Sequence, residues 1–183
     1  SLNLIKFIKF KETVLSVHRF SGLLTDTRVD GLSSYNVSSA DFKLIGLRAN
    51  ANLSWPTVVA NTYYSMKGNA FGFDVYGNGK MNAIVKDLKF CINFSFTLKD
   101  KHIQVKQVVT KISLGALDFH ATGLYDDEDT SKLLSDTISD MVPKMIDEYQ
   151  KDVTDNVNEI IKTLANEFLS TITLKDLLKI LGL

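Results

Sequence analysis

One apolar stripe in the last third of the sequence restricts the fold more than any other feature. Between residues 130 and 168, apolar residues recur at steps of three and four, which is the spacing of one face of an α-helix. The stripe consists of Leu134, Ile138, Met141, Val142, Met145, Ile146, Tyr149, Val153, Val157, Ile160, Ile161, Leu164 and Phe168. A helix from Thr130 to Phe168 would be about 58 Å long. A compact sphere made from a chain of this length would be only about 41 Å across, so we do not expect a compact ball.

An acidic run at residues 126–129 precedes the stripe. It suits a helix start, because negative groups are stabilised at the positive end of the helix dipole. Asp129 or Thr130 is the predicted N-cap residue. Pro143 removes one backbone hydrogen bond from the helix, yet the stripe keeps its phase across this residue. We therefore expect a kink near residues 139–143 and not a break.

The sequence before this helix has the patterns of β-strands, from Phe7 to about Phe119. Residues 47–55 and residues 90–98 alternate between apolar and polar side chains, so each strand has one dry face and one solvated face. Strands that follow one another through short turns, without crossover helices, predict an antiparallel sheet. The predicted turns are Asp30-Gly31, Lys67-Gly68-Asn69, Gly77-Asn78-Gly79 and Lys99-Asp100-Lys101.

These elements predict an α+β fold that forms a single domain over residues 1–183. Because the chain has only one long helix, the dry faces of the strands are its natural partner. We therefore expect a long C-terminal helix wrapped by a highly curved antiparallel β-sheet. A second, short helix is expected from Thr173 to Leu181, where leucines recur at helical spacing after a threonine cap.

The composition argues against several classes of partner. Lys plus Arg and Asp plus Glu each number 21, which gives a formal charge of zero, and the charges are scattered along the chain. Nucleic acid is therefore not an expected partner. No apolar run approaches the roughly 20 residues of a transmembrane segment. The chain starts at Ser1 without a signal-peptide pattern, so we interpret it as a mature or trimmed product.

Motifs of enzymes and of metal sites are absent from the sequence. It has no Gly-x-Ser-x-Gly motif, no phosphate loop and no His-Glu-x-x-His motif, and its three histidines lie far apart. Cys91 has the parity of the polar residues of its strand, so we expect an outward-facing free thiol. We predict a protein that is not an enzyme and that binds no metal. Sequons at Asn36, Asn52 and Asn93 leave secretion open but weigh little.

Three stretches of sequence occur in an order and at a spacing that are moderately specific. They are Phe20 to Val37 (FSGLLTDTRVDGLSSYNV), the Gly77 to Gly79 segment followed by Met81 to Phe90, and the passage from Ile112 to Leu124. With the predicted architecture, they resemble the insect takeout and haemolymph juvenile hormone binding protein family of tubular lipid-binding folds. The resemblance covers about Val17 to Leu183. The cysteine-free group 7 mite allergens are a second, weaker likeness.

The resemblance implies an apolar tunnel between the sheet and the helix. It also implies a secreted, extracellular protein that carries lipophilic small molecules such as terpenoid hormones, fatty acids or pigments. Members of the family usually have an N-terminal pair of cysteines that closes a small disulfide loop, and this chain lacks that pair. The size of the ligand and its route of entry are therefore left open.

The candidate ligand-binding residues are large side chains on the predicted dry faces, since Met and Phe suit surfaces that accept a flexible apolar guest. Each of them is also compatible with an ordinary packed core. Tyr149 and His120 could each give one polar contact to a ligand, although for His120 we favour a position on the rim. The candidates are Trp55, Tyr63, Met66, Phe71, Phe73, Phe90, Ile92, Phe94 and Phe96 on the sheet, and Met141, Met145 and Tyr149 on the helix.

The leading hypothesis is an extracellular carrier that holds a hydrophobic small molecule in an internal tunnel, with no other cofactor. Two alternatives stay open. One is a carotenoid- or bilin-binding pigment protein of the same family, and the other is an interfacial, surfactant-type structural protein. The expected partner is the hydrophobic small molecule, a transient contact with a membrane or a receptor is left open, and the oligomeric state is not predicted.

Overall fold

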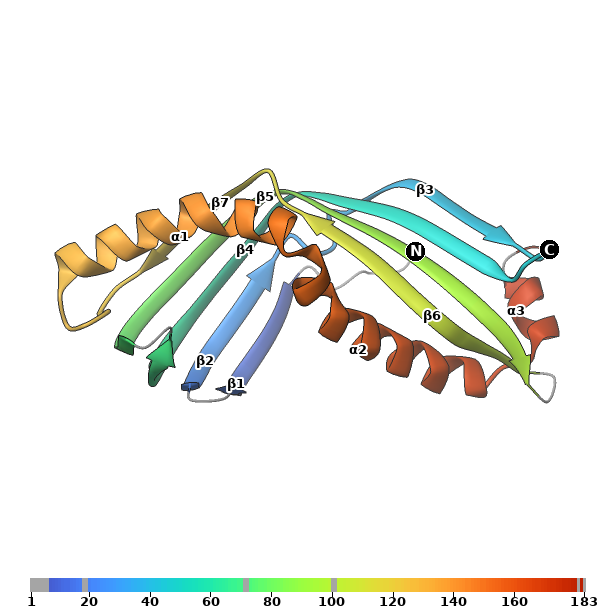
Figure 1. Ribbon diagram of the computed structural model, residues 1–183, viewed down its shortest axis with the longest axis horizontal. Coiled ribbons are helices and arrows are strands. Elements are labelled where there is room, and N and C mark those ends of the chain that lie inside the picture. The colour runs from blue at the N-terminus through green and yellow to red at the C-terminus, as the bar shows by residue number, and fades with distance from the viewer. Residues whose placement is uncertain (1–6, 18–19, 71–72, 100–101, 181, 183) are drawn as a thin grey trace. The chain divides into compact units, whose positions relative to one another are not determined.

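The computed structural model describes residues 7–17, 20–70, 73–99, 102–180 and 182. Along these residues the strands come first and the helices last (Figure 1). The strands are β1 (Phe7–Val17), β2 (Phe20–Asp30), β3 (Asn36–Lys43), β4 (Arg48–Ala70), β5 (Phe73–Lys99), β6 (His102–Ser113) and β7 (Ala116–Ala121), and the helices are α1 (Glu128–Glu148), α2 (Gln150–Ser170) and α3 (Leu174–Ile180). The predicted α+β class is confirmed.

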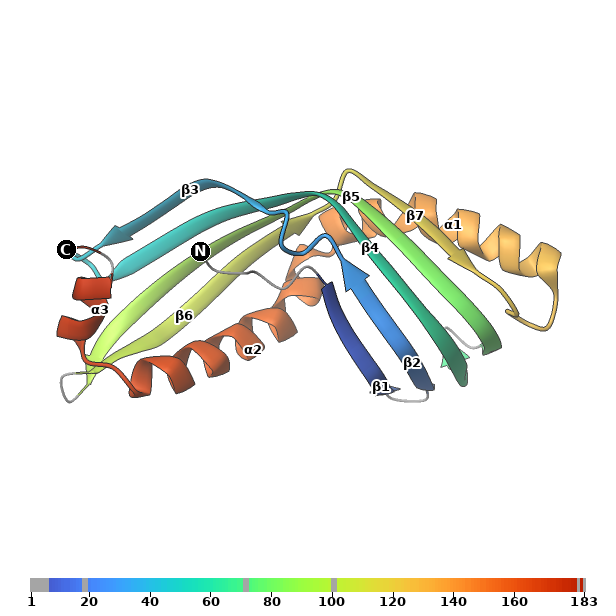
Figure 2. The same ribbon diagram turned by 180° about the vertical axis from the view of Figure 1, so that it is seen from behind.

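The strands form a large antiparallel sheet. In the described part of the chain, the hydrogen-bonded order is β1-β2-β4-β5-β6, with β3 paired to β4 and β7 paired to β5. The pairs β1/β2, β2/β4, β3/β4 and β5/β7 are all antiparallel, as expected for strands joined without crossover helices. Figure 2, which views the structure from behind, shows β3 running alongside β4.

Contacts within the chain divide it into two compact units that are interleaved in sequence. β4 and β5 contribute residues to both units, and the prediction of a single domain over residues 1–183 stays a prediction. Unit 1 is drawn from residues 1–35, 55–88 and 113–145, and unit 2 is drawn from residues 36–54, 89–112 and 146–183.

Each unit has its own hydrophobic core. In unit 1, Tyr64, Ala121 and Leu124 are buried, and half-buried side chains from β2, β4, β5, β7 and α1 pack against them. In unit 2 the buried cluster comes from β5, β6 and α2, and it includes Ile103, which has no exposed surface. The apolar faces of the strands are thus covered within each unit by a helix of the C-terminal region, as the alternation in the sequence predicts.

The apolar stripe forms two helices in place of the single predicted one. α1 continues through Pro143, and the helical pattern is interrupted at Tyr149, whose φ of −107° and ψ of 37° are not helical. We expected one helix with a kink near residues 139–143 and no break. This was wrong, because the helix is interrupted at Tyr149.

The side chain of Gln150 explains the interruption at the preceding residue. Its carboxamide nitrogen donates to the Ile146 carbonyl oxygen at 2.7 Å and also to the Ile112 carbonyl oxygen. Its carboxamide oxygen accepts a hydrogen bond from the Ile112 N–H at 3.1 Å. The side chain therefore satisfies backbone groups of the helix end and of β6, which allows the helix to stop and start again there.

Side-chain caps fix the starts of α1 and α3. The Asp127 carboxylate accepts a hydrogen bond from the Thr130 N–H at 2.7 Å, so Asp127 is the N-cap of α1, in place of the predicted Asp129 or Thr130. Hydrogen bonds from the Thr130 side chain and backbone lower the pKa of the Asp127 carboxyl below its ordinary value. The predicted short helix is confirmed as α3, whose start is capped by reciprocal hydrogen bonds between Thr173 and Asp176.

The turn predicted at Gly77-Asn78-Gly79 was wrong, because this segment lies inside β5. Its glycines permit a close approach of the backbone that follows β7. A Cβ atom at Gly79 would lie 2.2 Å from the Thr122 carbonyl oxygen, and one at Gly77 would lie 3.0 Å from the Gly123 carbonyl oxygen. The glycines are therefore needed because another segment of the backbone passes close to them, and not because the chain reverses direction here.

Two of the other predicted turns can be compared with the structure. Lys67-Gly68-Asn69 lies inside β4, so that turn was wrong as well. Asp30-Gly31 does end β2, and Gly31 has the positive φ of 89° that favours glycine. The turn predicted at Lys99-Asp100-Lys101 falls on residues 100 and 101, which lie outside the described residues.

Candidate functional site

The unit 2 half of β5 carries a row of phenylalanine side chains on its apolar face. Phe90, Phe94 and Phe96 are half-buried and pack around Ile92, which is buried. The rings of Phe94 and Phe96 are stacked, with centroids 5.6 Å apart, and Phe42 of β3 lies tilted against Phe96 at 6.2 Å. The alternation of residues 90–98 therefore brings four of the predicted candidates together on one surface.

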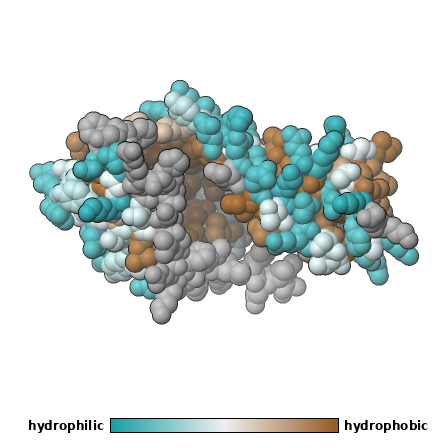
Figure 3. Space-filling model, turned by 60° about the horizontal axis from the view of Figure 1, so that its bottom comes forward, coloured by the Kyte–Doolittle hydropathy of each residue, from teal (hydrophilic) through white to brown (hydrophobic). Residues whose placement is uncertain are grey.

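α2 covers one side of this phenylalanine surface. Leu169 belongs to the buried cluster, and Ile161 and Ala165, which precede it at four-residue spacing, pack against this cluster. The adjacent row of the same helix, Ile160, Leu164 and Phe168, is 60%, 59% and 56% exposed. Figure 3 shows hydrophobic side chains at the surface among hydrophilic ones. An apolar row of this kind, on a helix whose neighbouring row packs into the phenylalanine cluster, provides a surface on which a nonpolar ligand could be buried.

A ladder of amide side chains holds α2 to β6, whose outer edge has no further strand in the described sheet order. The ladder consists of Gln150, Asn158 and Asn166, spaced eight residues apart. The Asn166 carboxamide oxygen accepts from the Val105 N–H at 2.7 Å, and the Asn158 carboxamide oxygen accepts from the Thr110 hydroxyl at 2.7 Å. Gln150 completes the ladder through its hydrogen bonds to the Ile112 backbone.

The spacing of this ladder matches the geometry of the two elements. From residue 150 to residue 166 the helix advances about 24 Å, and from residue 105 to residue 112 the strand advances about 23 Å. Amide side chains on the helix can therefore meet backbone groups of Val105 and Ile112, near the two ends of the strand, and the Thr110 hydroxyl between them. They shield an edge that would otherwise be open to pairing with another chain, and they fix which face of α2 turns toward the sheet.

A serine ladder plays the same part in unit 1, between α1 and β7. The hydroxyl oxygens of Ser131, Ser135 and Ser139 accept hydrogen bonds from backbone N–H groups at residues 124, 121 and 119, at 2.9, 3.0 and 2.9 Å. Each hydroxyl also donates to the carbonyl oxygen four residues earlier in the chain. Ser131 and Ser135 are each 1% exposed, so these hydrogen bonds satisfy polar groups in a dry environment.

Three other sheet candidates lie in unit 1. Trp55 is half-buried, and its Nε1 donates to the Leu32 carbonyl oxygen at 2.9 Å. Met66 packs against the cluster that contains Tyr64. Tyr63 is 49% exposed and lies on the opposite face of β4 from Tyr64, with the Lys80 ammonium 5.6 Å from its ring centroid.

The remaining candidates are not packed into a core, or they fall where the structure gives no side chain. Met141, Met145 and Tyr149 are 50%, 43% and 50% exposed. Phe71 lies outside the described residues, and the side chain of Phe73, the first residue of β5, also lies outside them. The assignment of all twelve candidates as ligand-lining residues therefore stays a prediction.

Two residues that the sequence singled out lie at other surfaces. His120 is exposed, and with Asp26, Tyr63 and Lys80 it lines a cleft of about 440 Å³ in unit 1. Cys91 is a free thiol that is half-buried.

Within the ranges that the structure describes, no group of three or more His, Cys, Asp or Glu residues is placed to hold a metal ion. No helix in those ranges is long and apolar enough to span a membrane.

Reasoning from the sequence missed the polar side chains that orient the helices and the buried tyrosine of unit 1. The Tyr64 hydroxyl donates to the Thr122 carbonyl oxygen at 2.7 Å, and burial raises its pKa. A search for Ser at four-residue intervals and for Asn or Gln at eight-residue intervals would have found both ladders. The apolar stripe was instead taken as the whole contact surface of the helix.

Comparisons with known proteins agree with this architecture. The chain is similar to the crystal structure of Takeout 1 from Epiphyas postvittana, with a TM-score of 0.65 and 13% identity over 92% of this chain and 81% of that one. At this identity, the similarity concerns the fold alone. A search of curated proteins finds no match. The model of the family described as haemolymph juvenile hormone binding protein (JHBP) matches residues 4–179. Because this match spans nearly the whole sequence, the chain belongs to the haemolymph juvenile hormone binding protein family.

Proposed function

We propose that this protein is an extracellular carrier that binds a hydrophobic small molecule, such as a terpenoid hormone, a fatty acid or a similar lipid, in an internal apolar tunnel. Membership of a family described by its juvenile hormone binding supports the class of ligand. The observation that carries the proposal is the unit 2 surface, where half-buried phenylalanine rings lie on the same core as a helix with an open apolar row.

Burial of apolar surface would supply most of the affinity. Each ligand CH₂ group that leaves water contributes about 0.8 kcal/mol, so a ten-carbon chain contributes several kcal/mol before the cost of ordering the ligand. Phe94 and Phe96 offer flat aromatic faces, and Leu164 and Phe168 offer flexible apolar groups on the helix. Such a surface selects a ligand by its length and width more than by hydrogen bonds.

Polar contacts would then orient the ligand. Tyr149, between the two helices, is half exposed and has a hydroxyl that could meet a carbonyl or hydroxyl group of the guest. His120 lies in unit 1, exposed beside Lys80 in the cleft described above, and a rim position suits it better than a buried contact.

The first test is to identify the guest. Native mass spectrometry of the purified protein, with its absorption spectrum and an organic extract of the same sample, should reveal a stoichiometric apolar adduct. A visible absorption band would select the pigment-binding alternative. A protein without a guest that also takes up no fluorescent fatty acid in a titration would contradict a carrier and favour the interfacial alternative.

The second test locates the site. Leu164→Ser removes an exposed apolar group from the α2 row and should weaken fatty acid binding about five- to tenfold. Phe94→Trp adds volume where the rings stack and should also weaken it. The matched control is Leu133→Ser, because Leu133 is a similarly exposed helix leucine, at 67%, and belongs to unit 1. Equal affinities for Leu164→Ser and Leu133→Ser would remove this surface from the proposal.

A further inference from the structure

The loop between β3 and β4 exposes two large aliphatic side chains that no described element covers. Ile45 is 96% exposed, the highest value among the large hydrophobic residues that the structure describes, and the adjacent Leu44 is 52% exposed. The turn is closed by a hydrogen bond from the Leu47 N–H to the Leu44 carbonyl oxygen at 3.3 Å. Gly46 has a φ of 86°, the left-handed conformation that a tight turn with Gly in its third position requires.

The base of this loop is anchored in the core of unit 2. Leu47 and Phe42 pack against the buried cluster, and the Leu47 carbonyl oxygen accepts a hydrogen bond from the Phe96 N–H at 2.8 Å. Leu47 holds a φ of 46°, which is uncommon for a non-glycine residue. We call Leu44 and Ile45 the tip of the loop. Because the base of the loop is fixed in this way, the side chains of the tip stay exposed to solvent, which is unfavourable for aliphatic groups.

Cations flank the aliphatic tip. Lys43 and Arg48 are direct cross-strand partners at the end of the hairpin, and both are exposed. Like charges placed opposite each other destabilise a hairpin. Asp41 offsets this only in part, because its carboxylate lies 4.0 Å from the Lys43 ammonium and both side chains are mostly solvated. The arrangement is costly for folding and suits an external anion.

The cations continue into a groove beside the hairpin. The groove has a volume of about 580 Å³, and Lys43, Arg48 and Lys106 line it together with amide side chains. None of the residues that line the groove is acidic. Amide donors and ammonium groups at one site are the groups that bind phosphate oxygens. The anionic partner would therefore meet the groove while the aliphatic tip enters a nonpolar layer next to it.

We propose that the β3–β4 tip, with Leu44 and Ile45 at its end and Lys43, Arg48 and Lys106 behind it, docks on the surface of an anionic phospholipid bilayer. Two aliphatic side chains are too few for a stable protein interface, which needs about 800 Å² from each partner. A bilayer needs no matching surface, since acyl chains accept apolar groups and headgroup phosphates accept cations. Phe94 and Phe96 of the phenylalanine surface also line the groove. The proposal nevertheless rests on the exposed tip and its cations, so it does not require a ligand on those rings.

The test is co-sedimentation of the full chain with vesicles of phosphatidylcholine alone and with vesicles that also contain phosphatidylserine. The protein should bind the anionic vesicles more tightly, and added salt should weaken that binding. Ile45→Ser should reduce binding about tenfold or more, as expected for losing one inserted aliphatic group. Lys43→Gln with Arg48→Gln should reduce it about fivefold for each cation removed.

Matched variants separate the tip from general effects. Leu133→Ser removes a 67% exposed leucine from α1, and Lys67→Gln with Lys132→Gln removes two exposed cations of unit 1. These controls should bind vesicles like the unchanged protein. Circular dichroism and titration with a fluorescent fatty acid should be the same for all variants, so failure of docking can be told from failure of the carrier function.

Several results would overturn the proposal. One is equal binding to neutral and anionic vesicles, and another is no binding to either. A third is equal loss of binding for Ile45→Ser and Leu133→Ser. Light scattering supplies a fourth, because a dimer that becomes a monomer on Ile45→Ser would assign the tip to contact between copies of the chain instead of to lipid.

Discussion

Asn166 carries the sharpest prediction about how the helices are held to the sheet. Its carboxamide oxygen accepts from the Val105 N–H at 2.7 Å, and its nitrogen makes a longer contact of 3.5 Å with the Val105 carbonyl oxygen. Asn166→Ala removes both partners. Val105 is 4% exposed, so water cannot take their place unless the strand edge opens. The variant therefore leaves a buried donor unsatisfied.

The expected loss follows from the cost of that donor. An unsatisfied buried backbone group costs about 1 to 3 kcal/mol, and alanine returns a few tenths of a kcal/mol because it is a better helix former than asparagine. We expect a net loss of about 1 to 2 kcal/mol for opening of this edge. A loss of this size makes the open state about 5 to 30 times more populated. The Val105 amide should therefore exchange its hydrogen faster by the same factor.

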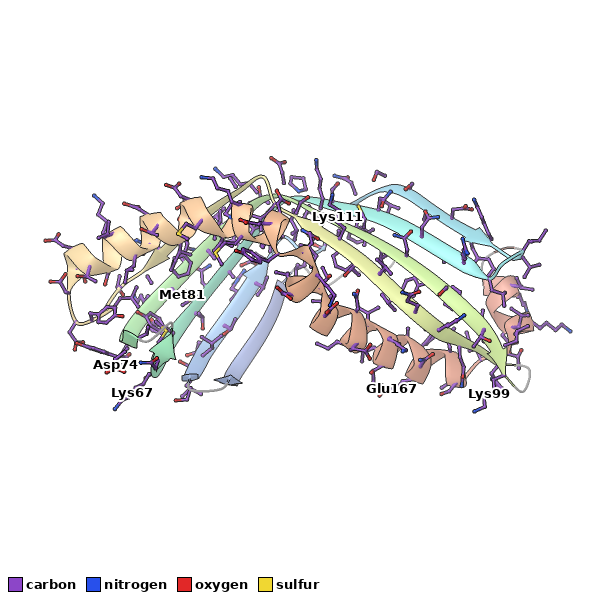
Figure 4. All side chains as sticks on the ribbon, in the orientation of Figure 1. Lys67, Asp74, Met81, Lys99, Lys111 and Glu167 are labelled. Carbon is purple, nitrogen blue, oxygen red and sulfur yellow. The ribbon has the colours of Figure 1, made fainter. Side chains whose placement is uncertain are left out.

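Hydrogen exchange at the Val105 amide is the assay, with Glu167→Ala as the matched control. Glu167 is the next residue of α2, and its side chain is exposed and points away from the sheet (Figure 4). The control should leave exchange at Val105 within about twofold of the unchanged protein, as expected for an exposed surface substitution. Equal exchange rates in Asn166→Ala and Glu167→Ala would refute the claim that the amide ladder closes the edge of β6.

Three further predictions concern backbone approach and pH. Gly79→Ala should destabilise the fold by about 3 kcal/mol or more, because the added Cβ would lie 2.2 Å from the Thr122 carbonyl oxygen. Thermal unfolding measures this loss of stability. The control Gly115→Ala should lose less stability, because its Cβ would meet the Asp87 side chain at 3.0 Å. The pKa of Asp127 is lowered in the folded state, so this cap stabilises the fold above pH 3.8 and loses its effect as pH falls. The difference in unfolding free energy between the unchanged protein and Asp127→Ala should therefore become smaller in acid. A difference that does not change with pH would contradict the assignment of Asp127 as the cap. Burial raises the pKa of the Tyr64 hydroxyl, so its contribution to folding stability is complete below pH 10.0 and is lost as pH rises. The difference in unfolding free energy between the unchanged protein and Tyr64→Phe should therefore become smaller in alkali. Denaturant titrations at several pH values measure this difference.

The parts of the fold that could be predicted from the sequence are those set by periodicity. The alternation over residues 90–98 placed Phe90, Ile92, Phe94 and Phe96 on one face, and the structure packs all four in one cluster. The stripe of steps of three and four predicted helix throughout the C-terminal third, which the structure confirms as α1 and α2. Both patterns are local consequences of burying one face of an element, so a single sequence contains them.

The errors in the fold arose where a distant partner decides the local structure. Gly77 and Gly79 are needed because another segment crosses them, and nothing in their neighbours indicates that crossing. The helix is interrupted at Tyr149 and not at Pro143 because the next residue, Gln150, binds the backbone of Ile112 in β6. Proline at position 143 removes one hydrogen bond, whereas the Gln150 side chain provides replacement partners, and the second effect can be read only from the packed chain.

The candidate site shows the same limit at the level of single side chains. Tyr63 and Tyr64 are equivalent by composition, and only the register of β4 exposes the first and buries the second. The apolar stripe gave no reason to separate Ile161 from Ile160, yet the first packs on the sheet cluster and the second is open. Which row of a wide stripe meets the sheet depends on how the helix is rotated about its axis. That rotation was set by polar residues outside the stripe.

The polar ladders therefore bear directly on ligand binding. A helix held only by apolar contacts would turn its most hydrophobic row into the core, and few apolar groups would be left for a guest. Gln150, Asn158 and Asn166 instead attach α2 to β6, and Ile160, Leu164 and Phe168 stay exposed. If this division is correct, weakening the ladder should let the open row compete for the core. Substitutions in the ladder should then lower fatty acid affinity, although the ladder side chains themselves bind β6.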